Sequence, residues 1–478
     1  MKSPQVVVVD LDGTLTLTDT LHESVLKLLH NNPLLLFLLP FWLVKGIAYL
    51  KFKVANNCLL DVTTLPYNLL LIDWLKEQKA NGKKIILCTA ANDRIAQAVS
   101  KYLGFFDDVI ASDATTNLKS GNKRHALQER YGDKGYDYVG NSIADMEVWA
   151  GAFNAIVVNA SARVQAKASH VASISRTFPS ENVGISDWLR ALRMHQWLKN
   201  LLLFVPLLTA HQVSNIQSLT SLLIAFISFS LCASSVYITN DLLDLENDRR
   251  HPRKKYRMFA SAKLPITIGL AIATLFISLS IALGVIVGTE FLVMLLMYLL
   301  LTIAYSLVLK RLVFLDCLTL ATLYTIRIIA GTAATSLSPS FWLLAFSMFI
   351  FLSLALVKRY AELIVQLKAG ESTTYGRGYL VTDASLLQTL GVSSGYISAL
   401  VVALYLRSDE VISLYEQPMA IWFVLPILLF WVSWVWLKAA RGEMHDDPIV
   451  FAITDKVSLY VASLTAILFA YAANGIGI

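Results

Sequence analysis

The sequence is organised around one polar stretch, Asn240-Asp241-Leu242-Leu243-Asp244-Leu245-Glu246-Asn247-Asp248, which follows the long apolar segment Leu219–Thr239. If the stretch is helical, Asp241, Asp244 and Asp248 lie at i, i+3 and i+7, on one face. Three carboxylates on one face repel each other unless a cation joins them, and Mg²⁺ prefers such hard oxygen ligands. The alternative is a charged loop that merely stops a transmembrane helix. The helical spacing of the carboxylates favours the magnesium site.

Composition divides the chain into two parts. Of its 478 residues, 56% are hydrophobic and 15% are charged, whereas soluble domains carry about 25% charged residues. Residues 1–185 are mixed and partly charged, while residues 198–478 are mostly apolar runs. We therefore predict two domains, 1–185 and 186–478, with the second in a membrane. The sequence starts almost directly with a short apolar run that ends in an aspartate, so we predict no signal peptide.

The first part opens with a buried strand that ends in two aspartates. The run Val6–Val9 is typical of a parallel strand, and Asp10-Leu11-Asp12-Gly13-Thr14 follows it. The ends of such strands form the usual ligand crevice of an α/β sheet, so we expect both carboxylates at a binding site. The motif resembles the opening motif of the haloacid dehalogenase-like phosphohydrolases. The resemblance implies a Rossmann-like α/β domain in which Asp10 is the phosphate-accepting nucleophile and Asp12 the general acid/base.

Two further segments match this family in its order. The apolar strand Lys84–Cys88 precedes Thr89, which matches the family's phosphate-binding hydroxyl. Lys119 and Lys123 are both candidates for the lysine that neutralises the phosphate. We prefer Lys123, because it begins a helix as the family's lysine usually does.

A third strand, Tyr136–Val139, leads to the expected metal site. The family commonly has an aspartate where Asn141 stands, and Asp145 follows four residues later. The resemblance implies Mg²⁺ held by Asp10, Asp145 and a backbone carbonyl near Asp12, with the side-chain oxygen of Asn141 as a further ligand. The missing charge at Asn141 concerns the strength of metal binding and not the fold. A decayed domain kept as a scaffold is the alternative, but every catalytic residue type is present.

An unusually apolar segment, residues 33–50, occupies the position of the family's cap, which we place at about residues 20–75. Pro33, Pro40 and Lys45 disfavour a membrane span, and a single span would also separate two halves of one sheet. We predict a helical cap that packs on the membrane interface or dips into it. An ordinary buried pair of cap helices is the alternative. If the interfacial prediction holds, the phosphatase substrate is carried in lipid.

The second part contains nine apolar runs of spanning length. They lie at about 198–213, 218–239, 264–287, 290–309, 312–333, 340–357, 391–406, 418–437 and 456–475. Cations concentrate in the loops after the second, fourth, sixth and eighth runs, which hold Arg249, Arg250, Arg253, Lys254, Lys255, Arg257, Lys263, Lys310, Arg311, Lys358, Arg359, Lys368, Arg377, Lys438 and Arg441. The opposite loops hold only Arg407. This asymmetry predicts that the cationic loops and the first domain are cytoplasmic.

Nine spans with Asn-Asp-x-x-Asp-x-x-x-Asp after the second resemble the UbiA superfamily of intramembrane prenyltransferases, over roughly residues 188–478. The resemblance implies an all-α membrane bundle with an Mg²⁺-diphosphate site beside a cavity that lipid can reach. In that site Asp241, Asp244 and Asp248 would bind Mg²⁺ and carry the chemistry, and Asn240 would support them.

The loop after the sixth run departs from the family pattern, which has a second aspartate-rich motif there. One carboxylate, Glu362, stands among Lys358, Arg359 and Arg377. Such cations suit a substrate with several separate phosphates, because arginine and lysine clamp non-bridging oxygens directly. The predicted phosphate-binding residues of this part are Lys199, Asn200, Arg257, Lys358, Arg359, Glu362 and Arg377. Arg327 lies inside the fifth run and is either functional or a structural arginine paired between helices.

This combination resembles the decaprenyl-phosphate phosphoribosyltransferase branch of the superfamily. The resemblance implies an Mg²⁺-dependent enzyme of the bacterial inner membrane that transfers 5-phosphoribosyl from phosphoribosyl pyrophosphate to a polyprenyl phosphate. We predict that the fused phosphatase then removes the 5-phosphate, which yields polyprenyl-phosphoryl ribose for cell-envelope glycans. The alternatives are an aromatic prenyltransferase that uses a prenyl diphosphate, and a lipid-binding or transport protein with a regulatory phosphatase domain. We expect no nucleic-acid partner, and the sequence predicts no particular oligomeric state.

Overall fold

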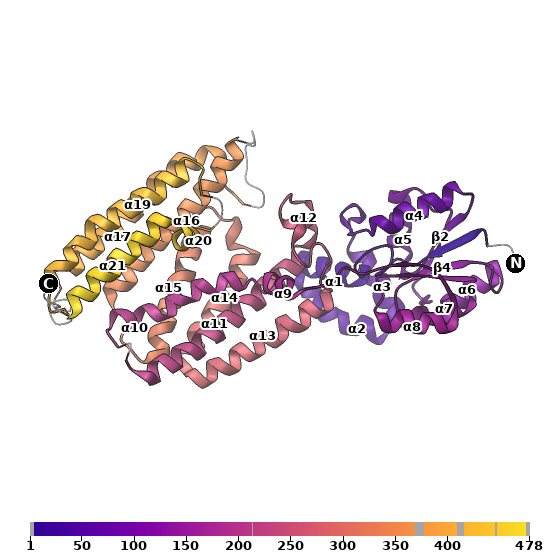
Figure 1. Ribbon diagram of the computed structural model, residues 1–478, viewed down its shortest axis with the longest axis horizontal. Coiled ribbons are helices and arrows are strands. Elements are labelled where there is room, and N and C mark those ends of the chain that lie inside the picture. The colour runs from indigo at the N-terminus through magenta and orange to yellow at the C-terminus, as the bar shows by residue number, and fades with distance from the viewer. Residues whose placement is uncertain (1–3, 213, 369–376, 409–414, 445–446, 475–478) are drawn as a thin grey trace. The chain divides into compact units, whose positions relative to one another are not determined.

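The computed structural model describes residues 4–212, 214–368, 377–408, 415–444 and 447–474 (Figure 1). The chain forms two compact units, each built from two separate segments. The first unit combines Met1–Arg193 with Tyr237–Thr274, and the second combines Met194–Val236 with Leu275–Ile478. The polar stretch at Asn240–Asp248 therefore belongs to the same compact unit as the phosphatase-like region. Residues 213 and 475, which end two of the predicted spans, lie outside the described residues.

A parallel sheet forms the centre of the first unit and confirms the predicted α/β domain. Its strand order is β3-β2-β1-β4-β5-β6. The strands are β1 (Val6–Val9), β2 (Lys84–Asn92), β3 (Asp108–Ser112), β4 (Asp137–Gly140), β5 (Asn154–Val158) and β6 (Ser173–Phe178). Val9 pairs with Leu87 of β2 on one side and with Val139 of β4 on the other. Asp10 therefore leaves the sheet where the strand order reverses, which is the usual ligand site of such sheets.

Helices cover both faces of this sheet, because its central strand is apolar on both sides (Figure 1). One face carries α4 (Leu69–Ala80) and α5 (Asp93–Leu103), and the other carries α6 (Gly121–Tyr131), α7 (Met146–Gly151) and α8 (Ala162–Val171). Successive strand residues point to opposite faces. Val7 and Val9 accordingly pack in one core and Val8 in the other. A strand buried on both sides has no polar alternation, which explains the uninterrupted valine run.

The cap is helical, as predicted. It comprises α1 (Thr20–Asn31), the 3₁₀ helix η1 (Pro33–Leu38), α2 (Leu39–Val44), α3 (Ile47–Asn57) and the 3₁₀ helix η2 (Val62–Thr64). Asp19 caps α1 by accepting hydrogen bonds from two backbone N–H groups of its first turn. Leu34, Phe37, Phe41 and Val44 are 73%, 70%, 69% and 88% exposed. A buried pair of cap helices would cover these side chains, so the exposure argues against that alternative, and the interfacial cap stays a prediction.

The segment Tyr237–Thr274 packs against the cap within the first unit. It contains the end of α11 (Ile216–Leu243), α12 (Leu245–Arg250), the 3₁₀ helix η5 (Lys254–Tyr256) and the start of α13 (Ile266–Val287). Leu242 of α11 joins Leu26 of α1 and Ala191 of α9 (Ile185–Ala191) in one buried apolar cluster. The phosphatase-like region is therefore packed against residues that follow the second predicted span.

The second unit is a bundle of helices, and the protein is a multi-pass membrane protein. Besides parts of α11 and α13 it contains α14 (Thr289–Leu307), α15 (Leu315–Thr335), α16 (Phe341–Lys368), α17 (Ala384–Tyr405), α19 (Val424–Ala440), α20 (Pro448–Thr454) and α21 (Lys456–Asn474). Among the described residues, 8 helices are long and apolar enough to cross a membrane. Helix α15 lies at the centre, since its side chains contribute to two buried clusters.

The first predicted span, 198–213, differs from the other eight and corrects the expectation of nine long α-helices. It forms the 3₁₀ helix η4 (Met194–Phe204) followed by the short α10 (Val205–Thr209). Pro206, in the first turn of α10, lacks a backbone N–H and so favours a new helix start there. This segment is not among the 8 helices of the described residues that are long and apolar enough to cross a membrane.

Small residues allow α16, α17 and α19 to pack closely. A Cβ atom at Gly391 of α17 would lie 2.1 Å from the Trp436 ring of α19, and one at Gly395 would lie 2.6 Å from Val432. Ser353 of α16 donates to the Gly391 carbonyl at 2.7 Å and accepts from Trp436 Nε1 at 3.1 Å. Because apolar burial does not drive helix association in lipid, such close contacts and interhelical hydrogen bonds hold the bundle together.

Replacing Gly391 by Leu is expected to destabilise the bundle by about 1–3 kcal/mol or more, because the Trp436 ring must move to admit the side chain. Thermal unfolding of the detergent-solubilised protein measures the effect. Leu390→Phe is the matched control, since Leu390 is 42% exposed on the same helix. Equal unfolding temperatures for Gly391→Leu and the wild type would contradict the close packing.

Candidate functional sites

A cavity of about 390 Å³ opens beside the end of β1 in the first unit. This volume lies in the range of small-molecule sites, about 300–1,000 Å³. Five residues predicted from the sequence line it: Asp10, Asp12, Lys123, Asn141 and Asp145. The loops that follow β1 and β4, together with α6, therefore bring these side chains to one place.

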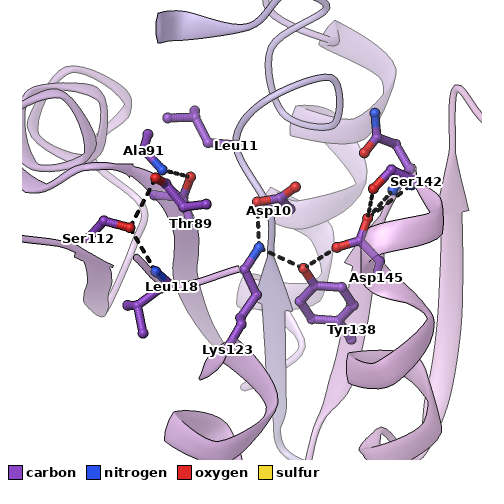
Figure 2. Close-up of polar contacts among 12 residues, drawn as sticks. Asp10, Leu11, Thr89, Ala91, Ser112, Leu118, Lys123, Tyr138, Ser142 and Asp145 are labelled. Atoms are coloured by element: carbon purple, nitrogen blue, oxygen red, sulfur yellow. Dashed lines mark hydrogen bonds and ion pairs between the residues drawn. The ribbon is translucent and has the colours of Figure 1, made fainter. Parts of the chain in front are cut away.

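A chain of hydrogen bonds connects the two principal carboxylates of this cavity (Figure 2). Lys123 Nζ donates to Asp10 Oδ1 at 2.7 Å and to the Tyr138 hydroxyl at 3.0 Å. The Tyr138 hydroxyl in turn donates to Asp145 Oδ1 at 2.8 Å. Of the two candidate lysines, Lys123 thus contacts Asp10, while Lys119 also lines the cavity. The sequence motifs do not indicate Tyr138, whose only signal is a hydroxyl-bearing residue inside a buried strand.

Asp145 is held rigidly beside Asn141. Its Oδ2 accepts from the backbone N–H groups of Asn141 and Ser142 at 3.1 and 2.9 Å, and from Ser142 Oγ at 3.0 Å. The Asn141 amide packs on Gly13, where a Cβ atom would lie 2.1 Å from Asn141 Nδ2. Gly13 also has φ +72°, so both its conformation and its lack of a side chain suit this position.

Burial raises the pKa values of the two aspartates that follow β1. It raises the pKa of Asp10 to about 6, although Lys123 opposes the shift. It raises the pKa of Asp12 to about 7, and the nearby Asp19 carboxylate adds to this shift. Burial alone would lower the pKa of Lys123, but Asp10 and Asp145 raise it above its ordinary value. Asp12 Oδ1 also accepts from the Thr20 N–H at 2.8 Å, which fixes the carboxyl group at the start of α1.

The second predicted phosphate-binding segment lies in β2. Thr89 is fully buried and its hydroxyl accepts from the Ala91 N–H at 2.9 Å, while the neighbouring Ala90 lines the cavity. Lys51 from the cap helix α3 reaches the same place. Its Nζ donates to the Ala90 carbonyl at 2.5 Å and to Asn117 Oδ1 at 3.2 Å. Lys51 is not part of any family motif quoted above, and no local pattern distinguishes it from Lys53 on the same helix.

Replacing Lys51 by Met is expected to lower kcat/KM for phosphate release by about 10- to 100-fold, mostly through KM, because a charged hydrogen-bond donor is lost from the cavity. Steady-state assays with p-nitrophenyl phosphate measure the change. Lys53→Met serves as the control, since Lys53 lies on the same helix against the Tyr49 ring. Unchanged kinetics for Lys51→Met would exclude a role for this side chain in binding.

The donor set of this cavity suits a magnesium ion. The described part of the chain contains no group of three or more His, Cys, Asp or Glu residues arranged to hold a metal. Asp10 and Asp145 nevertheless line one cavity together with the amide of Asn141. Mg²⁺ commonly binds through one or two carboxylates and takes its other ligands from water and substrate phosphate. These residues can therefore hold Mg²⁺ beside a bound phosphate.

The polar stretch keeps its helical spacing across a break. Helix α11 ends at Leu243 and α12 begins at Leu245, yet the N–H of Asp244 bonds to the Asn240 carbonyl at 3.0 Å and that of Asp248 to the Asp244 carbonyl at 2.8 Å. As this spacing predicts, Asp241 and Asp248 lie on one face.

One arginine joins the two carboxylates of that face. Arg257 donates to Asp241 at 3.0 Å and to Asp248 at 2.6 Å. Arg193 also pairs with Asp241. Burial raises the pKa of Asp248, and Arg257 opposes that shift. Asp241, Asp248, Arg193 and Arg257 thus form one cluster of ion pairs. Arg193 has no motif signal beyond its place just before the membrane part.

In the second unit, two predicted phosphate-binding lysines converge. Lys199 and Lys358 both donate to Asp447 Oδ2, at 2.5 and 3.3 Å. Asp447 is 8% exposed and follows the eighth predicted span. No motif indicates it, but a carboxylate in a loop of cations is a signal of its own. The two lysines thus converge on Asp447.

Three other predicted residues meet around Asp316, which starts α15. Arg359 Nε lies 3.0 Å from Asp316 Oδ2, and Arg359 also pairs with Glu362. Arg377 lies 3.6 Å from both carboxylates. The Tyr379 hydroxyl donates to Asp316 Oδ1 at 2.5 Å. Arg359 and Asp316 are almost fully buried, so this network supports the bundle whatever else it binds.

Asn200 and Arg327 form a separate buried network in the second unit. Asn200 Oδ1 accepts from Arg327 Nε at 2.9 Å, and Asn200 Nδ2 donates to Ser230 Oγ at 2.9 Å. Arg327 also donates to the Tyr298 hydroxyl at 3.1 Å. These contacts match the structural alternative for Arg327, an arginine paired between helices. They also engage both ends of the Asn200 amide away from the lysine pair.

The architecture defines a phosphatase-like α/β domain joined to an intramembrane helical bundle with an aspartate-rich stretch. Residues 201–464 match the UbiA prenyltransferase family, and residues 7–149 match the haloacid dehalogenase-like hydrolases. The chain therefore belongs to the UbiA prenyltransferase family and carries a haloacid dehalogenase-like domain in its N-terminal part.

Curated relatives extend this similarity. The chain is 35% identical to "Uncharacterized protein y4nM" of Sinorhizobium fredii over 98% of this chain and 90% of that protein. It is 34% identical to "Nodulation protein NoeC" of Azorhizobium caulinodans over 57% of this chain and 88% of that protein. It is 28% identical to "Decaprenyl-phosphate phosphoribosyltransferase" of Corynebacterium glutamicum over 58% of this chain and 84% of that protein. Both regions of the chain thus belong to enzyme families.

Proposed function

We propose that the protein is a bifunctional enzyme that makes a lipid-linked ribose in two steps, with domains at 1–185 and 186–478. The membrane part transfers 5-phosphoribosyl from phosphoribosyl pyrophosphate to a polyprenyl phosphate. The phosphatase domain then removes the 5-phosphate. The relative named decaprenyl-phosphate phosphoribosyltransferase supports the first step. The Asp10–Lys123–Tyr138–Asp145 chain is the observation that carries the second.

In the transfer step, an oxygen of the lipid phosphate attacks C1 of the ribose, and diphosphate leaves from the same carbon. Asp241, Asp244 and Asp248, supported by Asn240, would hold Mg²⁺, which would supply positive charge for the leaving diphosphate. Arg257 lies beside these carboxylates and is positioned to bind a phosphate oxygen. The other phosphate-binding residues are Lys199, Asn200, Lys358, Arg359, Glu362 and Arg377. The convergence of Lys199 and Lys358 on Asp447 supports this assignment for the lysines.

In the phosphatase step, a carboxylate oxygen of Asp10 attacks the phosphorus, and the P–O bond to the sugar breaks. Asp12 gives its proton to the departing sugar oxygen and later takes one from the water that hydrolyses the aspartyl phosphate. Lys123 and Thr89 stabilise the phosphate charge. Asp10, Asp145 and Asn141 would hold Mg²⁺ here, which would also supply positive charge to the phosphate.

The same proposal places the protein in the inner membrane of a bacterium, with the phosphatase domain in the cytoplasm. The concentration of lysine and arginine in alternate loops supports this orientation. The exposed apolar side chains of the cap, Phe37, Phe41 and Val44 among them, support contact with the membrane interface. The product, polyprenyl-phosphoryl ribose, would supply cell-envelope glycan synthesis.

The test uses the full-length protein in detergent with Mg²⁺, phosphoribosyl pyrophosphate and decaprenyl phosphate. Mass spectrometry of the lipid fraction is expected to detect phosphoribosyl lipid first and dephosphorylated ribosyl lipid later. Absence of both lipids would exclude the transferase. Prenylation of an aromatic acceptor from a prenyl diphosphate would instead favour an ordinary aromatic prenyltransferase.

A further inference from the structure

One wall of the phosphatase cavity comes from outside the phosphatase-like sequence. The cavity that contains Asp10 is also lined by Phe259, Ala262, Leu264, Pro265, Ile266 and Thr267. These residues follow the aspartate-rich stretch and belong to the same compact unit as Asp10. We propose that residues 259–267, the membrane-side wall, select a phosphate monoester that is carried on a membrane lipid over a free sugar phosphate. This inference rests on the proposed phosphatase function and specifies how its substrate is recognised.

The membrane-side wall is attached firmly to the cap. Arg249 Nε donates to the Ala260 carbonyl at 2.7 Å, and its two terminal nitrogens donate to the Glu23 carboxylate of α1 at 2.8 and 2.7 Å. The side chains of Arg249 and Glu23 are only 8% and 4% exposed. Such bidentate pairs fix geometry as well as add binding energy. Phe259 and Leu264 pack in the apolar cluster that includes α1. These contacts therefore hold the membrane-side wall in a fixed position beside the cavity.

A tight turn brings the wall to its final position. Ala262 adopts the left-handed conformation, with φ 58°, and reverses the chain just before Pro265 and the start of α13. Lys263 lies 3.7 Å from Asp187 of α9, an ion pair that holds the turn from its other side. Thr267 consequently lies in the first turn of α13 and contributes an exposed side chain to the cavity lining.

The position of α13 links this cavity to the bilayer. Helix α13 is one of the candidate membrane spans, with a mean hydropathy of 2.6. Because its first turn lines the cavity, the cavity lies where a transmembrane helix meets the membrane surface. A substrate whose prenyl chain stays in the bilayer can present its phosphate at this level. A free sugar phosphate gains nothing from such a position.

The chemistry of the lining suits an amphiphile. Lys51, Lys119 and Lys123 supply positive charge for a phosphate, whereas the exposed Pro265 supplies apolar surface. Free ribose 5-phosphate has polar groups all round and would leave the apolar wall in contact with hydroxyls. A phosphoribosyl group joined to a lipid offers both a phosphate end and an apolar end. The lining therefore favours the lipid-linked substrate.

The experiment compares hydrolysis of polyprenyl-phosphoryl ribose 5-phosphate in detergent micelles with hydrolysis of free ribose 5-phosphate by the full-length protein. Wild type is expected to prefer the lipid-linked substrate by at least tenfold, on the order of one optimised contact. Thr267→Trp, which fills the cavity at the wall, is expected to lower kcat/KM for the lipid-linked substrate by about 10- to 100-fold. Its kcat/KM for free ribose 5-phosphate should fall by a smaller factor, so that the preference for the lipid-linked substrate decreases.

Ile268→Trp is the matched control, because Ile268 is the next residue of α13, is 42% exposed and does not contribute to the cavity lining. It should keep both activities. Equal hydrolysis of the two substrates by wild type, or an equal loss of both activities in Thr267→Trp, would contradict substrate selection by the membrane-side wall. The proposed phosphatase function would still hold. Hydrolysis of p-nitrophenyl phosphate without any hydrolysis of the lipid-linked substrate would contradict both the proposed function and substrate selection by the membrane-side wall.

Discussion

Replacing Asp10 by Asn is expected to reduce phosphate release from the phosphoribosyl lipid to background, because an amide cannot form the aspartyl phosphate. Asn has nearly the same size as Asp and still reaches Lys123, so the fold should persist. Transfer from phosphoribosyl pyrophosphate should continue, and the phosphorylated lipid should accumulate. Thin-layer separation of labelled lipids measures both products in one reaction.

Asp73→Asn is the control for this prediction, because Asp73 is an exposed aspartate of α4 away from the cavity lining. It should release phosphate at the wild-type rate. Continued phosphate release by Asp10→Asn would show that the nucleophile is another group. A smaller loss, about 10²- to 10⁴-fold, is expected for Asp12→Asn, since general acid/base catalysis has that magnitude.

Replacing Asp241 or Asp244 by Ala is expected to abolish transfer, by at least about 10²-fold, because the carboxylates that hold Mg²⁺ against the leaving diphosphate are lost. The phosphatase should still act on supplied phosphoribosyl lipid. Asp241 pairs with Arg193 and Arg257, so its loss removes one ion pair from each arginine, while Arg257 keeps its pair with Asp248. Asp241→Asn keeps the size of the side chain and separates the loss of charge from any disturbance of packing.

Glu246→Gln is the control for these aspartate variants. Glu246 belongs to the same stretch, but its carboxylate pairs with Lys27 and Arg250 rather than with Arg257. Transfer by Glu246→Gln should match wild type. Simultaneous loss of transfer and phosphatase activity in Asp241→Asn would mean that the two sites do not work independently. Asp241 lies in the segment Tyr237–Thr274, which packs on the cap of the phosphatase-like region. The variant therefore tests whether a change at Asp241 also affects the phosphatase site.

Most of the architecture follows from local sequence. The valine run before Asp10 has no polar alternation, and a strand buried on both faces explains it. Most of the apolar runs have about the length that a bilayer requires, so hydrophobic length predicts most of the spans. The helical spacing of Asp241 and Asp248 predicts their common face, and Arg257 joins them there. Such features depend on neighbours in the chain, which is why sequence alone determines them.

Tertiary structure alone decided which distant residues meet. Tyr138 joins Lys123 to Asp145, and Lys51 of the cap donates to the Ala90 carbonyl. Asp447 accepts hydrogen bonds from two lysines. The contacts of Lys51 and Asp447 join residues far apart in sequence, and those of Tyr138 join separate elements, so no local pattern encodes the distances. The 3₁₀ form of the first predicted span also depends on packing, because its composition equally suits an α-helix.

The polar stretch at Asn240–Asp248 combines both kinds of information. Its carboxylate spacing, its place after an apolar segment and the cations behind it are sequence properties, and they predict metal and phosphate chemistry at a membrane surface. Its membership of the phosphatase-containing unit is a property of the fold. The physical reason is that Leu242, Phe259 and Leu264 bury their side chains against the cap, and only a folded chain brings those apolar surfaces together.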